Sequence, residues 1–281
     1  MSIVVSMLRT TFACCLLLLA SDALAGAWTV KPGETKVFTA STFTYGNHGF
    51  DENGKLVAVP DYQKFTLNSA VEYGVRSWLT GLVKAELREE RGYGELYRDR
   101  FPNPIFDPGQ PTVRVYYGER SDSFGAVAGG ARVRLLNGAH SVLSAEGLVA
   151  SGGVDTNGAG APSDGPFVEV RGLVGTGHTL AARPVFANVE AAYRYRFDAD
   201  DADEVLVDVT LGAQVLPRWM LLAQSFSTYE VDGNSHYTKV GASVVYQVKP
   251  KLALELGGLA TVYGKNAIQE FGGKLGFWWT Y

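Results

Sequence analysis

The sequence predicts an all-β fold, a 12-stranded antiparallel up-and-down transmembrane β-barrel. Three observations lead to it: a period of two in the last eleven residues, the same period in long segments throughout the chain, and connections that alternate between short and long. From Phe271 to Tyr281 the odd positions are aromatic or apolar apart from one glycine, whereas the even positions include Lys274. A β-strand with one face in an apolar medium has this pattern.

Twelve strands account for most of the chain, and no helix is predicted. Most of them span about 10–15 residues, which is long for a globular protein and sufficient to cross a membrane when tilted. The predicted strands are residues 35–45, 63–76, 79–92, 122–136, 139–151, 167–178, 183–197, 203–216, 217–230, 236–248, 251–263 and 269–281.

The connections between these strands differ in length and composition. Tight turns are predicted at residues 76–77, 137–138, 216–217 and 249–250, and loops rich in Gly, Pro and Asp at 46–62, 93–121 and 152–166. Bacterial transmembrane barrels have short periplasmic turns and long external loops. An even number of strands then places both chain ends in the periplasm. The loop 93–121 either lies on the surface or folds into the mouth and constricts it. The acidic stretch 198–204 is predicted to be a solvated surface turn rather than a place where divalent cations bridge lipopolysaccharide.

The amino-terminal 25 residues have the features of a secretory signal. One arginine precedes an apolar core at 12–20, and small residues at Ala23 and Ala25 fit a signal-peptidase site. We therefore expect export by the Sec pathway and two regions, a signal peptide at 1–25 and a barrel at 26–281. Both cysteines of the chain lie in the apolar core, so the mature protein has no disulfide framework and no thiolate metal site.

Composition narrows the class of protein further. Hydrophobic residues make up 46% of the chain and aromatic residues 12%, yet beyond the signal there is no apolar run long enough for a membrane-spanning helix. This combination favours strands that alternate between lipid-facing and lumen-facing residues. The net charge of −4 without a basic stripe gives no indication of nucleic-acid binding.

The alternation assigns the charged residues to the barrel lumen, because Lys or Arg on the lipid face costs roughly 2–4 kcal/mol at mid-depth. The predicted lumen-lining residues are Lys84, Glu86, Arg88, Glu90, Arg132, Arg134, Glu146, Glu169, Arg171, Glu190, Arg194, Arg196, Asp208, Lys239, Glu255 and Lys274. They could form an arginine ladder that selects anionic or sugar solutes, or a salt-bridge network that fills a narrow barrel, and the two can coexist.

Other classes of protein fit less well. A soluble β-sandwich would also show a period of two, but twelve long strands are many for one sandwich core. Tyrosines and tryptophans near strand ends, such as Tyr73, Trp219 and Tyr246, favour the aromatic girdles of a membrane barrel. The four histidines show no nucleophile–base arrangement, and no metal or cofactor motif is present, so we expect a protein that is not an enzyme.

Resemblances to an assembly signal and to two families support a location in the bacterial outer membrane. The aromatic carboxy-terminal strand resembles the signal that bacterial outer-membrane barrels present to the barrel-assembly machinery, which implies contact with that machinery, with lipid and with lipopolysaccharide. The hairpins, signal and aromatic end resemble the transporters of phenol-degradation pathways. About the first 60 mature residues are similar to XagA-type proteins encoded beside exopolysaccharide glycosyltransferases. The residues that carry this second resemblance are 26–29, 49–51, Gly54, 62–64, 72–74 and 78–80.

The leading functional hypothesis is passive movement of small hydrophilic or aromatic solutes across the outer membrane. An accessory role in exopolysaccharide export or surface attachment is the second, and a structural barrel with a closed lumen is the third. Neither resemblance implies catalytic residues or a cofactor.

Overall fold

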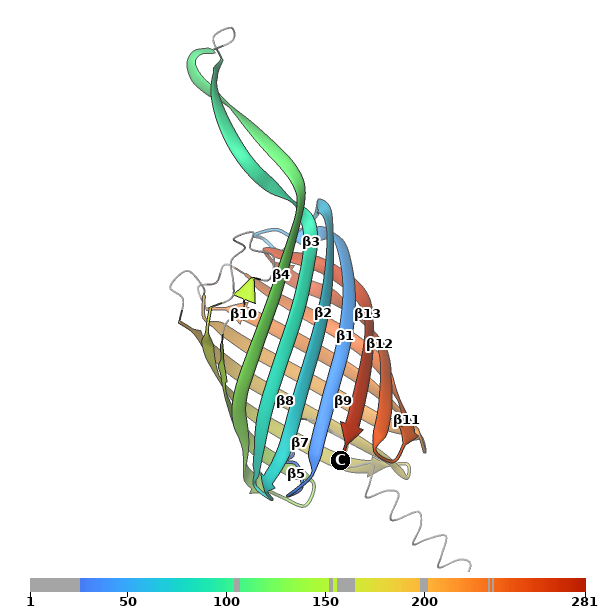
Figure 1. Cartoon of the computed structure of the whole chain (residues 1–281). Helices are drawn as coiled ribbons and strands as arrows, with labels where there is room; N and C mark the ends of the chain where they lie inside the picture. Colours follow the sequence, from blue (N-terminus) through green and yellow to red (C-terminus); the bar gives the residue numbers. More distant parts are fainter. Residues whose placement is uncertain are drawn as a thin grey trace, which may run out of the picture.

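The computed structural model describes residues 26–103, 107–151, 154–155, 165–197, 202–231, 233 and 235–281. They form a closed, all-antiparallel barrel of twelve long strands, joined by one two-residue strand, β6 (Figure 1). The predicted signal peptide lies outside the described residues. The predicted fold class is confirmed, including the number of strands in the wall.

The strands keep the order of the sequence around the barrel. Their bounds are β1 (Thr35–Phe50), β2 (Leu56–Arg76), β3 (Leu79–Asn103), β4 (Asp107–Asn137), β5 (Ser141–Ala150), β6 (Val154–Asp155), β7 (Phe167–Leu180), β8 (Arg183–Arg196), β9 (Glu204–Leu216), β10 (Trp219–Glu230), β11 (His236–Lys249), β12 (Leu252–Lys265) and β13 (Ala267–Thr280).

The first and last strands close the barrel. β1 pairs with β13 from Lys36↔Thr280 to Phe50↔Ala267, and each remaining long strand pairs with its neighbours in the chain, β5 directly with β7. β6 pairs only with β4. Closure leaves no free edge in the wall, which is the condition for a sheet to cross a lipid bilayer.

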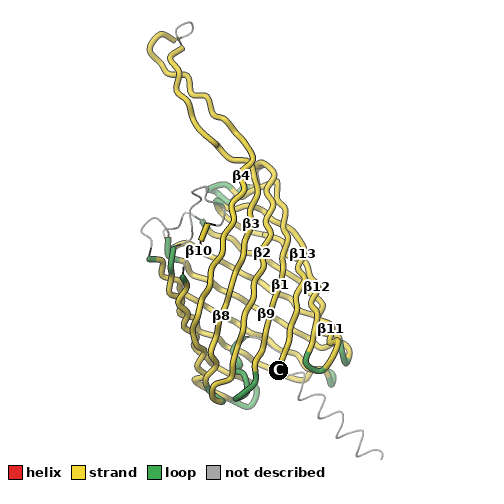
Figure 2. The backbone as a smooth tube through the Cα atoms, viewed as in Figure 1, coloured by secondary structure: helices red, strands yellow, loops and turns green. Residues whose placement is uncertain are grey.

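The two ends of the barrel differ. The turns at 77–78, 138–140, 181–182, 217–218 and 250–251 lie at the end that also holds the carboxy-terminus, which we call the turn end (Figure 2). The opposite end, the loop end, carries the β1–β2 and β3–β4 connections. The short turns thus gather at one end as predicted. At the loop end the fully described connections range from one residue, Asn266, to the five residues 51–55.

Two predicted loops are wrong in extent, because the strands continue through them. The β1–β2 ladder runs to Phe50↔Leu56, so 46–62 is mostly strand. The β3–β4 ladder runs to Asn103↔Asp107, and this hairpin projects away from the barrel (Figure 1). It does not fold into the mouth as a constriction. Beyond the wall the hairpin has two free edges, and prolines are tolerated at edges, which is why Pro102↔Pro111 does not end the ladder.

The outer face of the wall is apolar over most of its height. Leu256 is 68% exposed, and Val170 is 62% exposed. Val83, Leu87, Leu211, Phe271 and Leu275 also point outward, as the alternation predicts. An apolar surface of this extent needs lipid or a partner to cover it. No helix among the described residues is long and apolar enough to cross a membrane.

The segment before β1 turns into the barrel instead of continuing along its wall. We call residues 26–33 the plug. Ala27 and Val30 are fully buried, and the plug enters from the turn end. The backbone reverses at Gly33, whose φ of +80° favours glycine. Its N–H donates to the carbonyl of Gly74 on β2.

Candidate functional site in the barrel lumen

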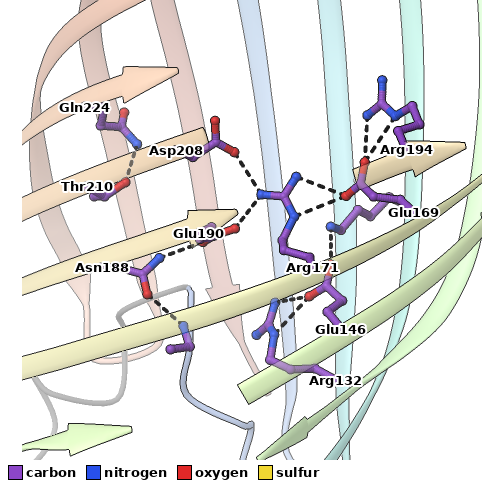
Figure 3. A network of polar contacts seen from close by, with 12 residues as sticks. Arg132, Glu146, Glu169, Arg171, Asn188, Glu190, Arg194, Asp208, Thr210 and Gln224 are labelled. Atoms are coloured by element: carbon purple, nitrogen blue, oxygen red, sulfur yellow. Dashed lines mark hydrogen bonds and ion pairs between the residues drawn. The ribbon is translucent and has the colours of Figure 1, made fainter. Parts of the chain in front are cut away.

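Among the described residues, four groups of ion-paired side chains lie in the lumen. The largest, the Arg171 cluster, spans β7, β8 and β9, and part of it is drawn in Figure 3. Its members are Arg171, Arg194, Arg196, Glu169, Glu190, Glu204 and Asp208. Each comes from an inward-facing position of its strand, because charged side chains in the outer face would meet lipid.

Arg171 is the centre of this cluster. Its Nη1 contacts Glu190 at 2.6 Å and Asp208 at 2.8 Å, and its Nη2 donates to Glu169 at 3.0 Å (Figure 3). Glu190 and Asp208 are directly opposed across β8 and β9. One guanidinium group thus separates three carboxylates that would repel each other without it.

Arg194 and Arg196 continue the cluster toward the loop end. Arg194 Nη2 donates to Glu169 at 2.8 Å, and its Nη1 donates to Glu204 at 2.8 Å. The guanidinium also lies 4.4 Å from the ring centroid of Phe167. Arg196 shares Glu204 at 3.0 Å. The fixed fork of arginine makes such two-partner contacts possible.

The second group, the Arg132 cluster, has three buried members, Arg132, Glu72 and Glu146. Arg132 is 4% exposed, and its Nη2 contacts Glu72 at 3.0 Å and Glu146 at 2.8 Å. Lys84 adds a contact to Glu146 at 2.7 Å. Arg132 Nη1 also donates to the carbonyl of Trp28 in the plug at 3.2 Å. This cluster therefore joins β2, β3, β4 and β5 to the plug.

The remaining groups lie on the wall around β1, β13 and β12. The Lys64 cluster contains Lys64, Arg88, Lys239, Glu86, Glu90 and Glu270. The fourth group is one pair, Glu255–Lys274 at 2.8 Å. Glu255 is 2% exposed and also accepts hydrogen bonds from Ser243 and from the indole of Trp278.

The plug is held by side chains from several strands. Asn188 accepts the N–H of Ala27 at 3.0 Å, and Thr80 accepts the N–H of Val30 at 2.9 Å. The hydroxyl of Ser144 donates to the carbonyl of Ala27. These bonds satisfy backbone groups that the irregular segment cannot pair within itself.

Two wall glycines give the plug its seat. A Cβ at Gly175 would lie 2.6 Å from two ring carbons of Trp28. A Cβ at Gly74 would lie 1.9 Å from the carbonyl oxygen of Lys31. Ala27 packs with Val142 and Leu173, and Trp28 packs against this group. The wall is therefore shaped to accept the plug backbone and one indole ring.

Two cavities of the lumen are lined by the described residues. The main cavity has a volume of about 800 Å³ and is lined by Gly26 and by members of all four charged groups. The turn-end cavity has a volume of about 560 Å³ and is lined by Trp28, both histidines of the stacked pair His140–His178, and Arg218. Phe186 and Trp278 line both cavities. The boundary between the cavities is thus apolar and aromatic.

The predicted lumen residues fall into three sets. Twelve of the sixteen line the main cavity, namely Lys84, Glu86, Arg88, Arg132, Glu169, Arg171, Glu190, Arg194, Arg196, Asp208, Glu255 and Lys274. Glu90, Glu146 and Lys239 are in the ion-paired groups without lining that cavity. Arg134 lies near the turn end of β4 and lines neither cavity. The arginines of the expected ladder that do line the cavity are all ion-paired.

Several lumen residues were not predicted. Lys64 and Glu72 alternate with the outward Phe65 and Tyr73 on β2, and Glu270 has the parity of Lys274 on β13, so the period of two could have assigned them. Glu204 is a correction: it is not part of a solvated turn, because β9 begins there with an inward-facing residue. The other acidic residues of that stretch up to 201 lie outside the described residues. Asn188 shares the parity of Glu190 and Arg194, so the period of two assigns it to the inside, whereas the plug has no such pattern.

In the part of the chain that the structure describes, no group of three or more His, Asp or Glu side chains has the geometry to hold a metal ion. The carboxylates of the lumen are instead engaged by Arg and Lys. What the site offers chemically is a polar chamber with fixed charges of both signs above an apolar boundary.

Comparison with known proteins supports the fold. No family profile and no curated protein matches the chain. The structure is similar to that of the COG4313 outer membrane channel from Pseudomonas putida F1, with 13% identity, a TM-score of 0.55, and coverage of 91% of this chain and 98% of that one. It is also similar to the transport unit of the autotransporter AIDA-I from Escherichia coli, with 9% identity, a TM-score of 0.50, and coverage of 96% and 97%. The shared fold is that of bacterial outer-membrane β-barrels.

Proposed function

We propose that this barrel is a passive channel for small solutes in the bacterial outer membrane, and that the structure is its closed state. The observation that carries the proposal is the series of two cavities in the lumen, of about 800 and 560 Å³, which meet at Phe186 and Trp278. Cavities of this size match those that hold small molecules in other proteins. A purely structural barrel would not need such cavities in its lumen.

The path is closed by the plug and by the apolar boundary. Gly26 lines the main cavity and Trp28 the turn-end cavity, so the plug runs beside the point where the two meet. The plug belongs to no strand of the wall and is held by separate hydrogen bonds. It can therefore leave without breaking the barrel, and its departure would join the cavities.

The location and orientation follow from the wall. The apolar outer face supports insertion in a bilayer, with lipopolysaccharide around its external leaflet. Trp279 and Tyr281 stack at 4.5 Å at the turn end, as expected of an interfacial girdle in the periplasmic leaflet and of a strand read by the barrel-assembly machinery. Sec-dependent export with cleavage after Ala25 delivers the chain there.

The solute class is proposed from the lining. The main cavity presents Arg171, Arg194 and Arg196 beside carboxylates, which suits small hydrophilic solutes, and its boundary presents aromatic rings, which suits aromatic ones. The resemblance to transporters of phenol-degradation pathways agrees with the second type of solute. The chain's structural similarity to a protein described as an outer membrane channel agrees with transport in general.

A second candidate is favoured by the β3–β4 hairpin. It extends beyond the wall on the loop end, where a partner or a polysaccharide could bind it (Figure 1). An isolated two-stranded ribbon is at best marginally stable in water, so a bound partner would stabilise it. This would fit an accessory role in exopolysaccharide export or surface attachment, as the similarity to XagA-type proteins implies, with the lumen closed.

Single-channel conductance in planar bilayers tests the proposal. The refolded mature chain should show rare discrete steps, and the double variant Arg194→Gln/Arg196→Gln should shift ion selectivity toward cations. Glu204 then loses both of its cationic partners, and Glu169 keeps Arg171 alone. Absence of conductance from a folded barrel, both for the mature chain and for a variant with a displaced plug, would rule out a solute path and favour the accessory role.

A further inference from the structure

The plug begins inside the lumen, and its first residue lies against a carboxamide. Gly26 is buried, and a Cβ there would lie 2.4–2.7 Å from three side-chain atoms of Asn188. Asn188 is fixed from both sides: it accepts the N–H of Ala27 and donates to Glu190 at 2.6 Å (Figure 3). A side chain at position 26 would push Asn188 away from both partners. Gly26 is thus confined against the carboxamide of Asn188, which Glu190 holds in place.

The Arg171 cluster, which includes Glu190, has one more carboxylate than guanidinium groups. Among the described residues its four carboxylates are paired with three guanidinium groups. The excess falls where Glu190 and Asp208 oppose each other, because both depend on the same nitrogen of Arg171. Both carboxylates are half-buried, and a partly desolvated negative charge that shares its only paired cation is costly. A further cation at this place would stabilise the lumen.

The other three lumen groups show that the imbalance is local. Within the described residues the Arg132 cluster has two cations and two carboxylates. The Lys64 cluster has three of each, and Glu255–Lys274 is one pair. Of the four groups that the described residues form, the one with an excess carboxylate is therefore also the one beside which the plug begins.

We propose that removal of the signal peptide supplies the missing cation: the α-ammonium group of Gly26 binds beside Asn188 and Glu190 and holds the plug in the lumen. Hydrolysis of the Ala25–Gly26 amide breaks its C–N bond. The oxygen of the water stays on Ala25 as part of a carboxylate, and its two hydrogens complete the ammonium group of Gly26. In the uncleaved chain the same nitrogen is an amide without charge, so it cannot neutralise the cluster.

The site then distinguishes processed from unprocessed chains. An ammonium group fits a position that admits no side chain at Gly26 and that already has a carboxamide oxygen and a carboxylate at hand. Any residue added before Gly26 replaces the ammonium by an amide and must find room in the main cavity. This inference rests on cleavage after Ala25 and does not require that the barrel conducts solutes.

Titration of the Gly26 amine tests it directly. The refolded mature chain, labelled with ¹⁵N-glycine, is titrated by NMR beside the peptide Gly-Ala-Trp-Thr, whose α-amino pKa is about 8. We expect the pKa of Gly26 to be at least one unit above that of the peptide, and Glu190→Gln to lower it by one unit or more. Burial alone would lower the pKa of an amine. A value at or below that of the peptide in the folded barrel would overturn the proposal.

Controls separate the charge effect from loss of structure. Glu86→Gln removes a lumen carboxylate from the balanced Lys64 cluster and should leave the Gly26 titration unchanged. Asp208→Asn replaces Glu190→Gln if that variant does not refold, as judged by heat-modifiable migration in SDS gels, and should also lower the pKa. In a third chain the amine is acetylated, and amide hydrogen exchange at 27–30 should become at least tenfold faster. Equal protection in the acetylated chain would show that the ammonium does not hold the plug.

Discussion

Replacing Gly175 by leucine should displace the plug while leaving the barrel wall intact. Gly175 lies on β7 beneath the indole of Trp28, and a Cβ there would lie 2.6 Å from two ring carbons and 3.1 Å from the Cβ of Ala27. The Cβ of Ala27 cannot move away, because Ala27 and its neighbour Leu173 are completely buried. The indole must therefore leave its seat, and it takes the plug backbone with it.

The size of the effect follows from the overlap. Inserting methylene groups into a well-packed site costs about 1–3 kcal/mol. This cost falls on the seated state alone, because Trp28 is no longer above Gly175 once the plug has left. At 1.36 kcal/mol per factor of ten, the ratio of seated to displaced plug should fall by roughly 5- to 150-fold. Both the open fraction of the channel and the exchange of plug amides should increase by that factor.

Planar-bilayer recordings and amide hydrogen exchange at 27–30 measure these two quantities. Gly172→Leu is the matched control, because Gly172 lies on the same strand, faces outward, and has no atom within 4 Å of an added Cβ. If a folded Gly175→Leu barrel keeps the plug amides as protected as in the Gly172→Leu barrel, the steric argument is refuted. If the plug is displaced and conductance stays absent, the plug is not the gate.

Other substitutions test the lumen and the wall. Arg132→Met removes the cation that pairs with buried Glu72 and leaves Glu146 with Lys84 alone. It should destabilise the barrel by about 3–5 kcal/mol in urea unfolding from lipid vesicles, and no loss would show that the cluster is not structural. Gly212→Val places a Cβ 1.7 Å from the ring of Phe186 and should lower the unfolding free energy by about 1–3 kcal/mol, by the same measurement. In the β8–β9 connection, hydrogen bonds from the Tyr193 hydroxyl and then from a backbone N–H hold the pKa of Asp203 below its ordinary value of about 3.9. That stabilisation is complete above the ordinary pKa and is lost as the pH falls through the lower folded-state pKa. In a plot of the urea midpoint of unfolding against pH, Asp203→Asn should therefore reduce the decrease of the midpoint at acid pH.

The wall could be predicted because alternate residues of a membrane-spanning strand must be apolar. Leu87, Leu211 and Leu256 all point outward as the period of two requires, since a charge in any of their places would meet lipid. Strand ends were harder to place. Gly, Pro and Asp in 46–62 and 93–121 normally mark loops, but the register of neighbouring strands carries the ladder through them.

The alternation could assign many residues to the lumen, but it could not predict which of them form ion pairs with each other. Parity assigned Arg171 and Glu190 to the inside, yet which carboxylates share Arg171 depends on the stagger between β7, β8 and β9. A shift of two residues would keep every side chain inside and change every partner. The same period, applied to β2, would also have found Lys64 and Glu72.

The plug could not be predicted, because it has no repeating pattern. Its seat is made by Asn188, Ser144 and Thr80, which lie on strands far apart in the sequence and meet only when the barrel is closed. In the sequence, Gly175 and Gly74 cannot be distinguished from the other glycines of the strands, although both contact the plug in the structure. A tertiary contact of an irregular segment leaves no mark at the level of composition or periodicity.

The pairing of the first strand with the last has a consequence for how the molecule forms. Every other long strand finds its partners within one connection, whereas the β1–β13 seam joins Lys36 to Thr280. Contacts so distant in the chain form slowly, because the entropy lost in closing the loop comes before any gain. Closure of this seam should therefore limit the rate of assembly. Substitutions at Ala40↔Gly276 should slow refolding more than equal substitutions within the β7–β8 hairpin. The plug directly precedes β1, so it can enter the lumen until β1 pairs with β13.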